Sequence, residues 1–181
     1  MKKLKVTIIG YGGMGSFHAK LIQANPEVEV HGIFDILESR QQAGEADGYS
    51  AYASLEEALN DACADTILIA TPNDVHKEIA VQALEAGKHV ICEKPVTLNS
   101  EELSEIMHTA KEHERVFMVH QNRRWDSDFQ MVKDLYENRK IGEVFHIESR
   151  VQGANGIPGD WRHLKAHGGG MLLDWGVHLL D

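Results

Sequence analysis

Short apolar, β-branched segments alternate with helix-like segments through the first 120 residues, and this alternation constrains the fold more than any other feature. Six strands are predicted, at 5–9, 28–34, 49–52, 66–70, 89–92 and 116–119. Helices are predicted between them, at about 13–25, after residue 35 up to 48, at 54–60, 73–86 and 100–114. Strands that alternate with helices pair in parallel, with helices on both faces of the sheet. We therefore expect an α/β fold with a doubly wound parallel sheet.

The pattern changes after about residue 120. A helix is expected at about 126–138, an alternating strand at 144–151, then a glycine-rich stretch and a last helix from about Met171. We therefore predict two domains, one over 1–120 and a second that begins at 121 and runs to 181. The second part is too short to close its own core, so we expect a truncated chain that is not catalytically competent by itself.

Composition excludes several classes of partner. The net charge is −10, most of the acidity lies in 1–120, and no basic stripe is present that could neutralise nucleic-acid phosphates. No run of about 18 apolar residues is available for a membrane span, and the apolar stretch after the basic N-terminus is too short for a signal peptide. The two cysteines, Cys63 and Cys92, have no metal-type spacing. We expect both to be small buried hydrophobes in a reducing, cytoplasmic protein.

One glycine-rich segment matches the pattern G-x-G-x-x-G. It follows the first predicted strand, opens the first predicted helix, and reads Gly10-Tyr11-Gly12-Gly13-Met14-Gly15. In this pattern the first glycine permits a tight turn, the second lets a pyrophosphate approach the backbone, and the third lets helix and strand pack closely. The amides at the helix N-terminus would then face the phosphates. The segment predicts a Rossmann-type dinucleotide-binding domain over 1–120.

A single carboxylate, Asp35, stands at the end of the second predicted strand, 20 residues beyond Gly15. At that place a carboxylate accepts hydrogen bonds from the ribose hydroxyls and repels a 2′-phosphate, which favours NAD over NADP as the cofactor. Arg40 lies about a turn later and weakens the preference slightly. Asp35 could also act as a helix N-cap, and the two roles are compatible.

Two further motifs resemble a known family. One runs from Ala70-Thr71-Pro72-Asn73 through His76 to Glu85-Ala86-Gly87-Lys88-His89-Val90-Ile91-Cys92-Glu93-Lys94-Pro95. The other is Gly168-Gly169-Gly170-Met171-Leu172-Leu173-Asp174-Trp175-Gly176-Val177-His178, a D-x-G-x-H pattern preceded by glycines. Together they resemble the glucose–fructose oxidoreductase/inositol dehydrogenase (Gfo/Idh/MocA) family over the whole chain. The resemblance implies a second, α+β domain built on a large, mostly antiparallel sheet, most of it beyond Asp181.

The resemblance also implies roles for individual residues. Lys94 is similar to the family lysine between nicotinamide and substrate, and Lys94-Pro95 is then expected to be a cis peptide. Asp174 and His178 resemble the pair that positions the reacting hydroxyl and takes its proton. Residues along the cofactor would be Thr71, Pro72, Asn73 and Glu93. The residue chemistry agrees, because a histidine titrates near neutral pH and a nearby ammonium favours a developing alkoxide. Residues four apart in a helix also share one face.

Two other segments are candidates for contact with substrate. Arg123 and Arg124 follow the last strand of the predicted sheet, and Trp161 and Arg162 precede the glycine run. An ordinary ion pair at a domain junction is an equally good interpretation of the two arginines. His163 and His167 with Asp174 and His178 could suggest a metal set, but such spacing arises easily among 11 histidines, and no metal is expected.

The function that these features favour is hydride transfer between NAD, or less readily NADP, and a secondary alcohol of a sugar or cyclitol. Neither a nucleic acid nor a membrane is an expected partner. The resemblance implies a homo-oligomer for the full-length form, associating through the large sheet. The alternative is a dinucleotide-sensing or cofactor-binding protein without turnover. Lys94, Asp174 and His178 occurring together argue against it, since a sensor has no need of all three.

Overall fold

The computed structural model describes residues 3–153 and 159–181. The chain forms two compact units, Met1–Val119 and His120–Asp181, and each is described here by itself. Of the predicted glycine-rich stretch, Gly156 lies outside the described residues. No helix in the described part of the chain is long and apolar enough to cross a membrane.

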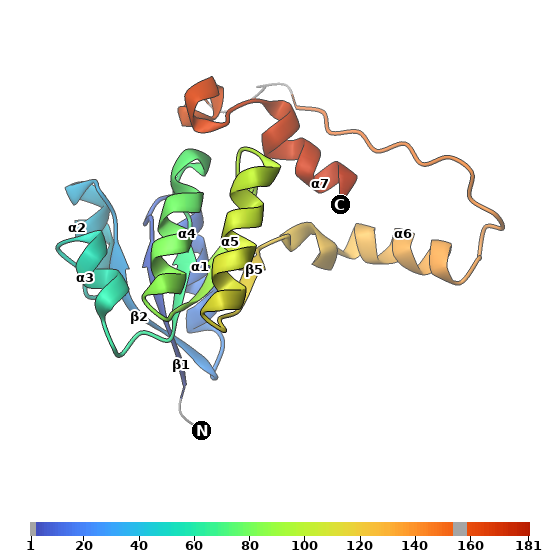
Figure 1. Ribbon diagram of the computed structural model, residues 1–181. Helices are drawn as coiled ribbons and strands as arrows, with labels where there is room; N and C mark the ends of the chain where they lie inside the picture. The colour runs from blue at the N-terminus through green and yellow to red at the C-terminus, as the bar shows by residue number, and fades with distance from the viewer. Residues whose placement is uncertain (1–2, 154–158) are drawn as a thin grey trace. The chain divides into compact units, whose positions relative to one another are not determined.

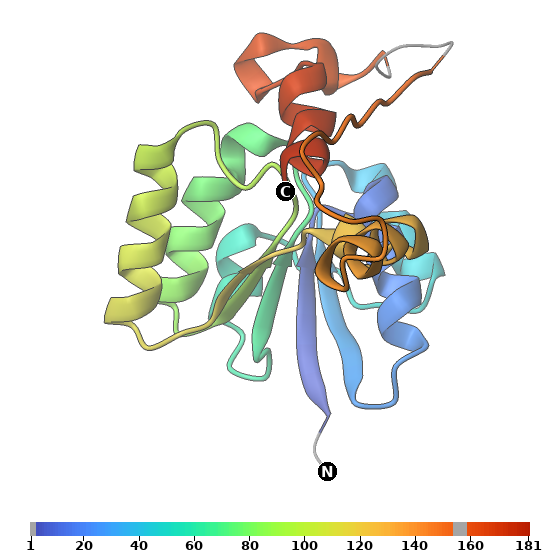
Figure 2. The ribbon, with the colours of Figure 1, turned by 90° about the vertical axis from the view of Figure 1, so that its right-hand side faces the viewer.

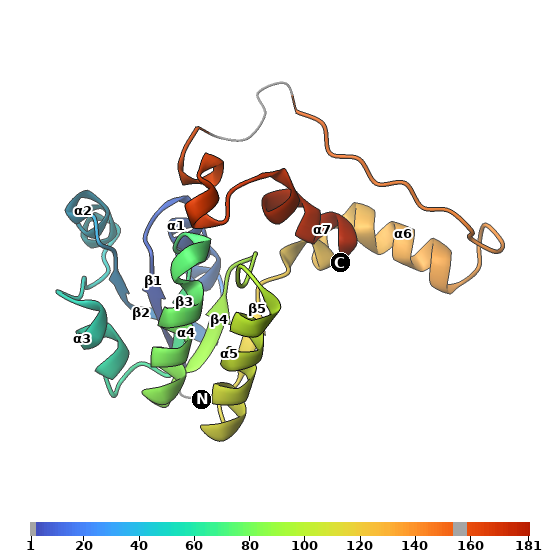
Figure 3. The ribbon, with the colours of Figure 1, turned by 45° about the horizontal axis from the view of Figure 1, so that its top comes forward.

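The first unit contains a five-stranded sheet whose neighbouring strands all run parallel. Its strands are β1 (Leu4–Ile9), β2 (Val28–Phe34), β3 (Thr66–Ile69), β4 (His89–Cys92) and β5 (Phe117–Val119). Their order across the sheet is β2-β1-β3-β4-β5, and all five are labelled in Figure 3. The prediction of a parallel α/β sheet is therefore confirmed.

One of the six predicted strands, at 49–52, is wrong as a full strand. Ala51 forms only one parallel bridge, to Ile33 of β2. Two backbone bonds make it: the Ile33 amide donates to the Ser50 carbonyl, and the Tyr52 amide donates to the Ile33 carbonyl, each at 2.9 Å. The segment is short because a left-handed Gly48 precedes it and the next helix begins soon after it. It still lies beside β2, where the third strand of a Rossmann sheet belongs.

Five α-helices connect the strands (Figure 1). They are α1 (Gly13–Gln23), α2 (Glu38–Ala46), α3 (Leu55–Asn60), α4 (His76–Glu85, after a 3₁₀ turn at Asn73–Val75) and α5 (Ser100–Glu112). Ser54 caps α3, because its hydroxyl accepts from the Glu57 amide at 3.1 Å, and the Glu57 carboxylate accepts from the Ala53 amide. Gly87 follows α4 in the left-handed conformation, which a glycine adopts without strain.

The apolar residues of the sheet divide between two cores, one on each face. Ile67 and Ile69 of β3 are fully buried and pack in the larger core, which includes residues of α3, α4 and α5. Leu68 lies between them in sequence and packs in the opposite core. That core also contains Val6 and Ile8 of β1 and Ala19 of α1. Figure 2 shows α4 and α5 on one side of the sheet and α1 on the other. A strand that is covered on both faces is apolar throughout, which explains the unbroken run in β3.

The second unit is helical where the structure describes regular elements. The predicted helix at 126–138 is confirmed as α6 (Ser127–Glu137), which follows a 3₁₀ turn at Asn122–Trp125. Further along come 3₁₀ turns at Trp161–His163 and Lys165–His167, a π-helical segment at Leu172–Gly176 and α7 (Val177–Leu180).

The predicted strand at 144–151 is wrong for this structure. Those residues form no regular element, and Phe145 is 97 % exposed. A strand needs a neighbour to take up its backbone hydrogen bonds, and the described residues of the second unit supply none. The expected start of an antiparallel sheet is therefore absent from the described part of the chain, and the α/β sheet of the first unit is the sheet that is present.

The expectation for the cysteines is half correct. Cys92 is buried in the larger core, whereas Cys63 is exposed. Cys63 lies in the turn after α3, where its amide donates to the Asp61 carboxylate at 2.7 Å. A turn residue whose backbone is held in this way has no need to bury its side chain.

Candidate active site

The helices that follow the neighbouring strands β1 and β3 pack on opposite faces of the sheet. β1 lies between β2 and β3; α1, which follows β1, packs in one core and α4, which follows β3, packs in the other. In open α/β sheets this is the topological switch point, and ligands bind outside the carboxyl ends of the strands there. The predicted cofactor residues of the first unit all follow strand ends at this edge. They are Gly10–Gly15 after β1, Asp35 after β2, Thr71–Asn73 after β3, and Glu93 and Lys94 after β4.

Each of the three glycines of the G-x-G-x-x-G pattern has a different steric environment. Gly10 has φ +92°, and a Cβ there would lie 2.7 Å from the Ala70 carbonyl oxygen. A Cβ at Gly15 would lie 1.9 Å from the Gly10 carbonyl oxygen, so the fold itself requires both glycines. A Cβ at Gly12 would meet only the guanidinium of Arg40, at 3.4 Å. The backbone at Gly12 is therefore open to the close approach of a ligand.

The N-terminus of α1 suits an anion. Gly12 is its N-cap and supplies no side-chain cap, and its first turn holds no acidic residue. Gly13 and Met14 belong to that turn, and a Cβ at Gly13 would meet nothing within 4 Å. Helix N-terminal amides without a side-chain acceptor bind phosphate groups readily, with help from the helix dipole. The segment Gly10–Gly15, called here the glycine loop, and the first turn of α1 thus fit the pyrophosphate of a dinucleotide.

Asp35 fixes the glycine loop relative to the turn after β2. One of its carboxylate oxygens accepts from the Tyr11 amide at 2.8 Å, and the other accepts from the Leu37 amide at 2.9 Å. The residue is only 3 % exposed. Asp35 is not the N-cap of α2, since that position is Leu37. It bridges two backbone segments by hydrogen bonds, a role that its position in the sequence did not reveal.

Arg40 lies over the same carboxylate. Its guanidinium is 3.4 Å from the Asp35 carboxylate, and about half of the Arg40 side chain is exposed. The cation therefore lies against both Asp35 and Gly12. A ligand group beside Asp35 meets a carboxylate that is partly offset by a positive charge.

The Tyr11 side chain points away from the loop backbone. Its hydroxyl donates to the Asp47 carboxylate at 2.8 Å, and burial together with Asp47 raises the pKa of the phenol above its ordinary value. Tyr11 can therefore serve the cofactor only through its backbone.

The loop after β3 is held by a histidine. His76 is fully buried, and its two ring nitrogens lie 3.0 Å from the carbonyl oxygens of Thr71 and Pro95. Burial lowers the pKa of this imidazole. The hydroxyl oxygen of Thr71 is buried without a hydrogen-bond partner among the described residues. Such an oxygen fits a loop that completes its hydrogen bonding with a ligand.

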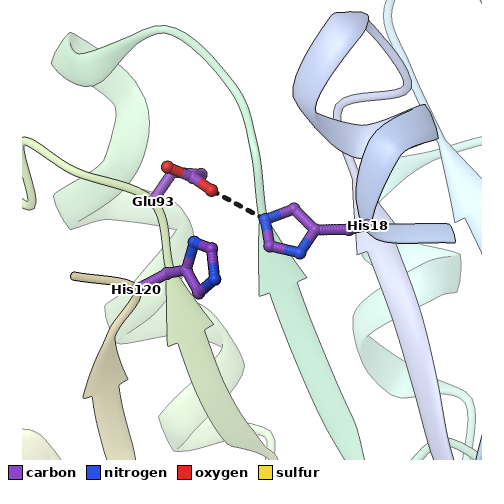
Figure 4. Close-up of side chains that lie close together, drawn as sticks. All are labelled: His18, Glu93 and His120. Atoms are coloured by element: carbon purple, nitrogen blue, oxygen red, sulfur yellow. Dashed lines mark hydrogen bonds and ion pairs between the residues drawn. The ribbon is translucent and has the colours of Figure 1, made fainter. Parts of the chain in front are cut away.

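Lys94 follows β4 directly, and the Lys94-Pro95 peptide is cis, as expected. The Lys94 amide donates to the side chain of Glu93 at 3.2 Å. Figure 4 shows a second contact of Glu93, in which His18 of α1 lies 2.7 Å from its carboxylate. Glu93 and His18 are both buried.

Asp174 and His178 belong to the second unit, and they do not share one α-helix. Asp174 lies in the π-helical segment and His178 in α7. Gly176 is the last residue of the π-helical segment, and a Cβ there would lie 2.9 Å from Leu172. Asp174 lies 3.9 Å from the guanidinium of Arg162, and the His178 ring packs edge-on against Trp175. Single π turns inside helices are frequent at functional sites.

The candidate substrate residues make contacts within the second unit. Arg123 pairs with Asp126 at 2.7 Å, and Arg124 pairs with Asp181. The ion-pair interpretation therefore describes both arginines, although the pairs lie inside one unit. Arg162 stacks over the Trp161 ring at 4.5 Å. That stacking places a cation beside Asp174, close to the D-x-G-x-H motif.

The structure thus brings together two groups of predicted residues, one in each unit. That Lys94 meets Asp174 and His178 stays a prediction. The sequence interpretation overlooked His18, although it lies on the packed face of α1 with Gly15 and Ala19. A polar residue at that helical spacing indicates a buried partner.

Comparisons with known proteins agree with this geometry. Residues 4–121 match the family model for an oxidoreductase family with an NAD-binding Rossmann fold, and residues 129–181 match the GFO/IDH/MocA C-terminal domain. The solved structure of an NAD-binding protein from Listeria innocua is 62% identical, with a TM-score of 0.97 over 99% of this chain and 53% of that one.

Two relatives of known sequence also resemble the chain. The uncharacterized oxidoreductase YdgJ of Escherichia coli is 38% identical, over 98% of this chain and 52% of its own length. The scyllo-inositol 2-dehydrogenase (NADP(+)) IolW of Bacillus subtilis is 32% identical, over 98% of this chain and 50% of its own length. The chain spans about half the length of the curated relatives it matches. From the two family models and the loops at the switch point, the chain belongs to the Gfo/Idh/MocA family of oxidoreductases, and its first unit is an NAD(P)-binding Rossmann domain.

Proposed function

We propose that the protein is a dehydrogenase that transfers a hydride between a nicotinamide cofactor and a secondary alcohol of a sugar or cyclitol. The observation that carries this proposal is the placement of Lys94 at the same carboxyl edge as the glycine loop. Gly10, Gly12, Gly15 and the first turn of α1 hold the dinucleotide phosphates, and Thr71 to Asn73 lie along it. The bound nicotinamide supplies the carbon that accepts or donates the hydride.

The chain's own residues manage the proton and the charge. His178 takes the hydroxyl proton as the hydride leaves, because an imidazole can gain and lose a proton near neutral pH. Asp174 accepts a hydrogen bond that orients the substrate hydroxyl or the imidazole, and its negative charge stabilises the protonated ring. Lys94 donates to the substrate oxygen and stabilises the negative charge that develops there.

The substrate class follows from what these groups can recognise. A carboxylate, an imidazole and an ammonium around one hydroxyl suit a polar ring alcohol, and Arg162 stacked on Trp161 offers further donors and an aromatic face. The name of the Bacillus subtilis relative specifies an inositol as substrate. A cyclitol or a sugar is therefore the class to test first.

NAD is the favoured cofactor. The Asp35 carboxylate disfavours a 2′-phosphate, while Arg40 beside it reduces that repulsion. The name of the Bacillus subtilis relative specifies NADP(+), so both cofactors belong in the test.

The test combines binding with turnover in the whole gene product. Titration calorimetry with NAD and NADP measures cofactor affinity, and a panel of inositols, sugars and simple alcohols is assayed for reduced cofactor. Production of NADH with a polyol but not with simple alcohols supports the proposal. Tight NAD binding without turnover on any substrate would instead support a cofactor-sensing protein.

A further inference from the structure

A buried histidine–glutamate pair joins α1 to the end of β4. The Nε2 atom of His18 lies 2.7 Å from Oε1 of Glu93, and the two side chains are only 6 % and 7 % exposed. Burial of a carboxylate is unfavourable unless a donor accompanies it. His18 is such a donor, and it comes from the helix that opens with the glycine loop.

The second oxygen of the same carboxylate holds the backbone of Lys94. Oε2 of Glu93 accepts from the Lys94 amide at 3.2 Å, while the Glu93 amide donates to the Ile69 carbonyl at 2.9 Å. Each oxygen of the carboxylate therefore has a protein donor, one from His18 and one from Lys94. With so little of Glu93 exposed, its contribution to a cofactor site is through the loop that it shapes.

The far side of Lys94 is fixed as well. The carbonyl oxygen of Pro95 lies 3.0 Å from His76, whose other nitrogen lies 3.0 Å from the Thr71 carbonyl. The backbone on either side of Lys94 is thus tied to buried groups. These backbone hydrogen bonds consequently limit the positions that the Lys94 ammonium can reach.

We propose that His18 is a positioning residue for Lys94, acting through Glu93. This inference rests on the proposed role of Lys94 in turnover. By holding the Glu93 carboxylate in place, His18 fixes the orientation of the Lys94 amide and so the direction in which the side chain leaves the loop. Misplacement of a catalytic group by about 1 Å costs roughly 10²-fold in rate, so a buried contact one residue away can control kcat.

Three variants separate positioning from simple packing. His18→Phe keeps a buried ring but removes the donor. His18→Gln keeps an N–H that can still reach Glu93, and Glu93→Gln keeps the shape of the acceptor without its charge. Thr109→Val is the matched control, because it removes a partly buried hydrogen bond to the Glu105 carbonyl in α5, away from the loop.

The expected result is a loss of kcat without a matching loss of cofactor binding. In the whole gene product, His18→Phe should lower kcat by about tenfold or more, change the Kd for NAD by less than about threefold, and keep a cooperative thermal transition. His18→Gln should restore most of kcat. Because both residues act on one contact, His18→Phe/Glu93→Gln should be no slower than His18→Phe alone. Thr109→Val should lower Tm and leave kcat unchanged.

A second readout does not depend on turnover. The Lys94 amide resonance in a ¹H–¹⁵N spectrum should move in His18→Phe and stay near its wild-type position in His18→Gln. If His18→Phe does not fold, the Glu93→Gln and His18→Gln variants decide by the same spectrum and by kcat. A folded His18→Phe with wild-type kcat and an unmoved Lys94 resonance would overturn the inference. If Lys94→Met itself keeps full kcat, the proposed function of Lys94 fails instead, whatever His18 does.

Discussion

The position of a Gly15 Cβ lies 1.9 Å from the carbonyl oxygen of Gly10, so position 15 has no room for a side chain. Gly15→Ala should therefore destabilise the first unit by about 3 kcal/mol or more, since backbone must shift. Gly12→Ala meets only the end of a flexible arginine and should leave Tm nearly unchanged.

The same Gly12→Ala change should weaken NAD binding by roughly tenfold or more, because the added methyl occupies the space proposed for the pyrophosphate. Thermal denaturation and titration calorimetry measure the two effects separately. Gly153→Ala, at an open position in the second unit, is the control and should alter neither. Undiminished NAD affinity in Gly12→Ala would show that the loop is only a structural turn.

Asp35 and Arg40 should act in opposite directions on cofactor choice. Arg40→Ala removes the cation that offsets the carboxylate, so NADP affinity should fall by about tenfold and NAD affinity by less than threefold. Asp35→Ser removes the proposed repulsion of a 2′-phosphate and should narrow the proposed preference for NAD over NADP. Calorimetric titrations with both cofactors measure the ratio, and Arg115→Ala provides the same change of charge away from the loop. A ratio that Arg40→Ala leaves unchanged would contradict this account of specificity.

Stability should fall in acid partly through Asp61. Hydrogen bonds from the Tyr52 hydroxyl and the Cys63 amide lower the pKa of Asp61 from 3.8 to about 2. The carboxylate thus stabilises the folded state above about pH 4, and this contribution is lost as the pH falls through about 2. Tyr52→Phe removes the 2.6 Å bond and should cost about 1–2 kcal/mol at neutral pH.

The difference in free energy of unfolding between wild type and Tyr52→Phe should shrink as the pH is lowered from about 4 to about 2. Urea denaturation at a series of pH values measures it, with Tyr136→Phe, on an exposed part of α6, as the control. A difference that stays constant over this range would show that the Tyr52 bond does not favour the ionised form of Asp61.

Local chemistry made much of the first unit predictable. The apolar runs of β3 and β4 needed no tertiary information, because strands covered on both faces are apolar throughout. The Ser54 cap and the left-handed Gly87 follow from the requirements of helix ends. The glycine loop was equally predictable from the sequence, since the spacing of its glycines reflects one tight turn and one close helix–strand contact.

What could not be predicted depends on partners that are distant in sequence. The alternation at 144–151 is the pattern of a strand, but a strand forms only where a neighbour accepts its backbone bonds. The hydrogen bond from the Tyr11 amide to the Asp35 carboxylate joins two parts of the chain that are far apart in sequence, and so does the contact of His18 with Glu93. Periodicity alone therefore gave no sign of either contact.

The most direct test of the central claim, that a nicotinamide-dependent alcohol dehydrogenase acts through His178, is the pH–rate profile of the whole gene product. His178→Ala should lower kcat by roughly 10²–10⁴-fold, and Lys94→Ala should also slow turnover. The NAD affinity of His178→Ala should stay close to wild type, since the proposed dinucleotide contacts lie in the glycine loop and at Asp35. The ionisation near neutral pH in the wild-type profile should disappear in this variant. If that ionisation persists and kcat hardly changes, His178 is not the base and the account is contradicted.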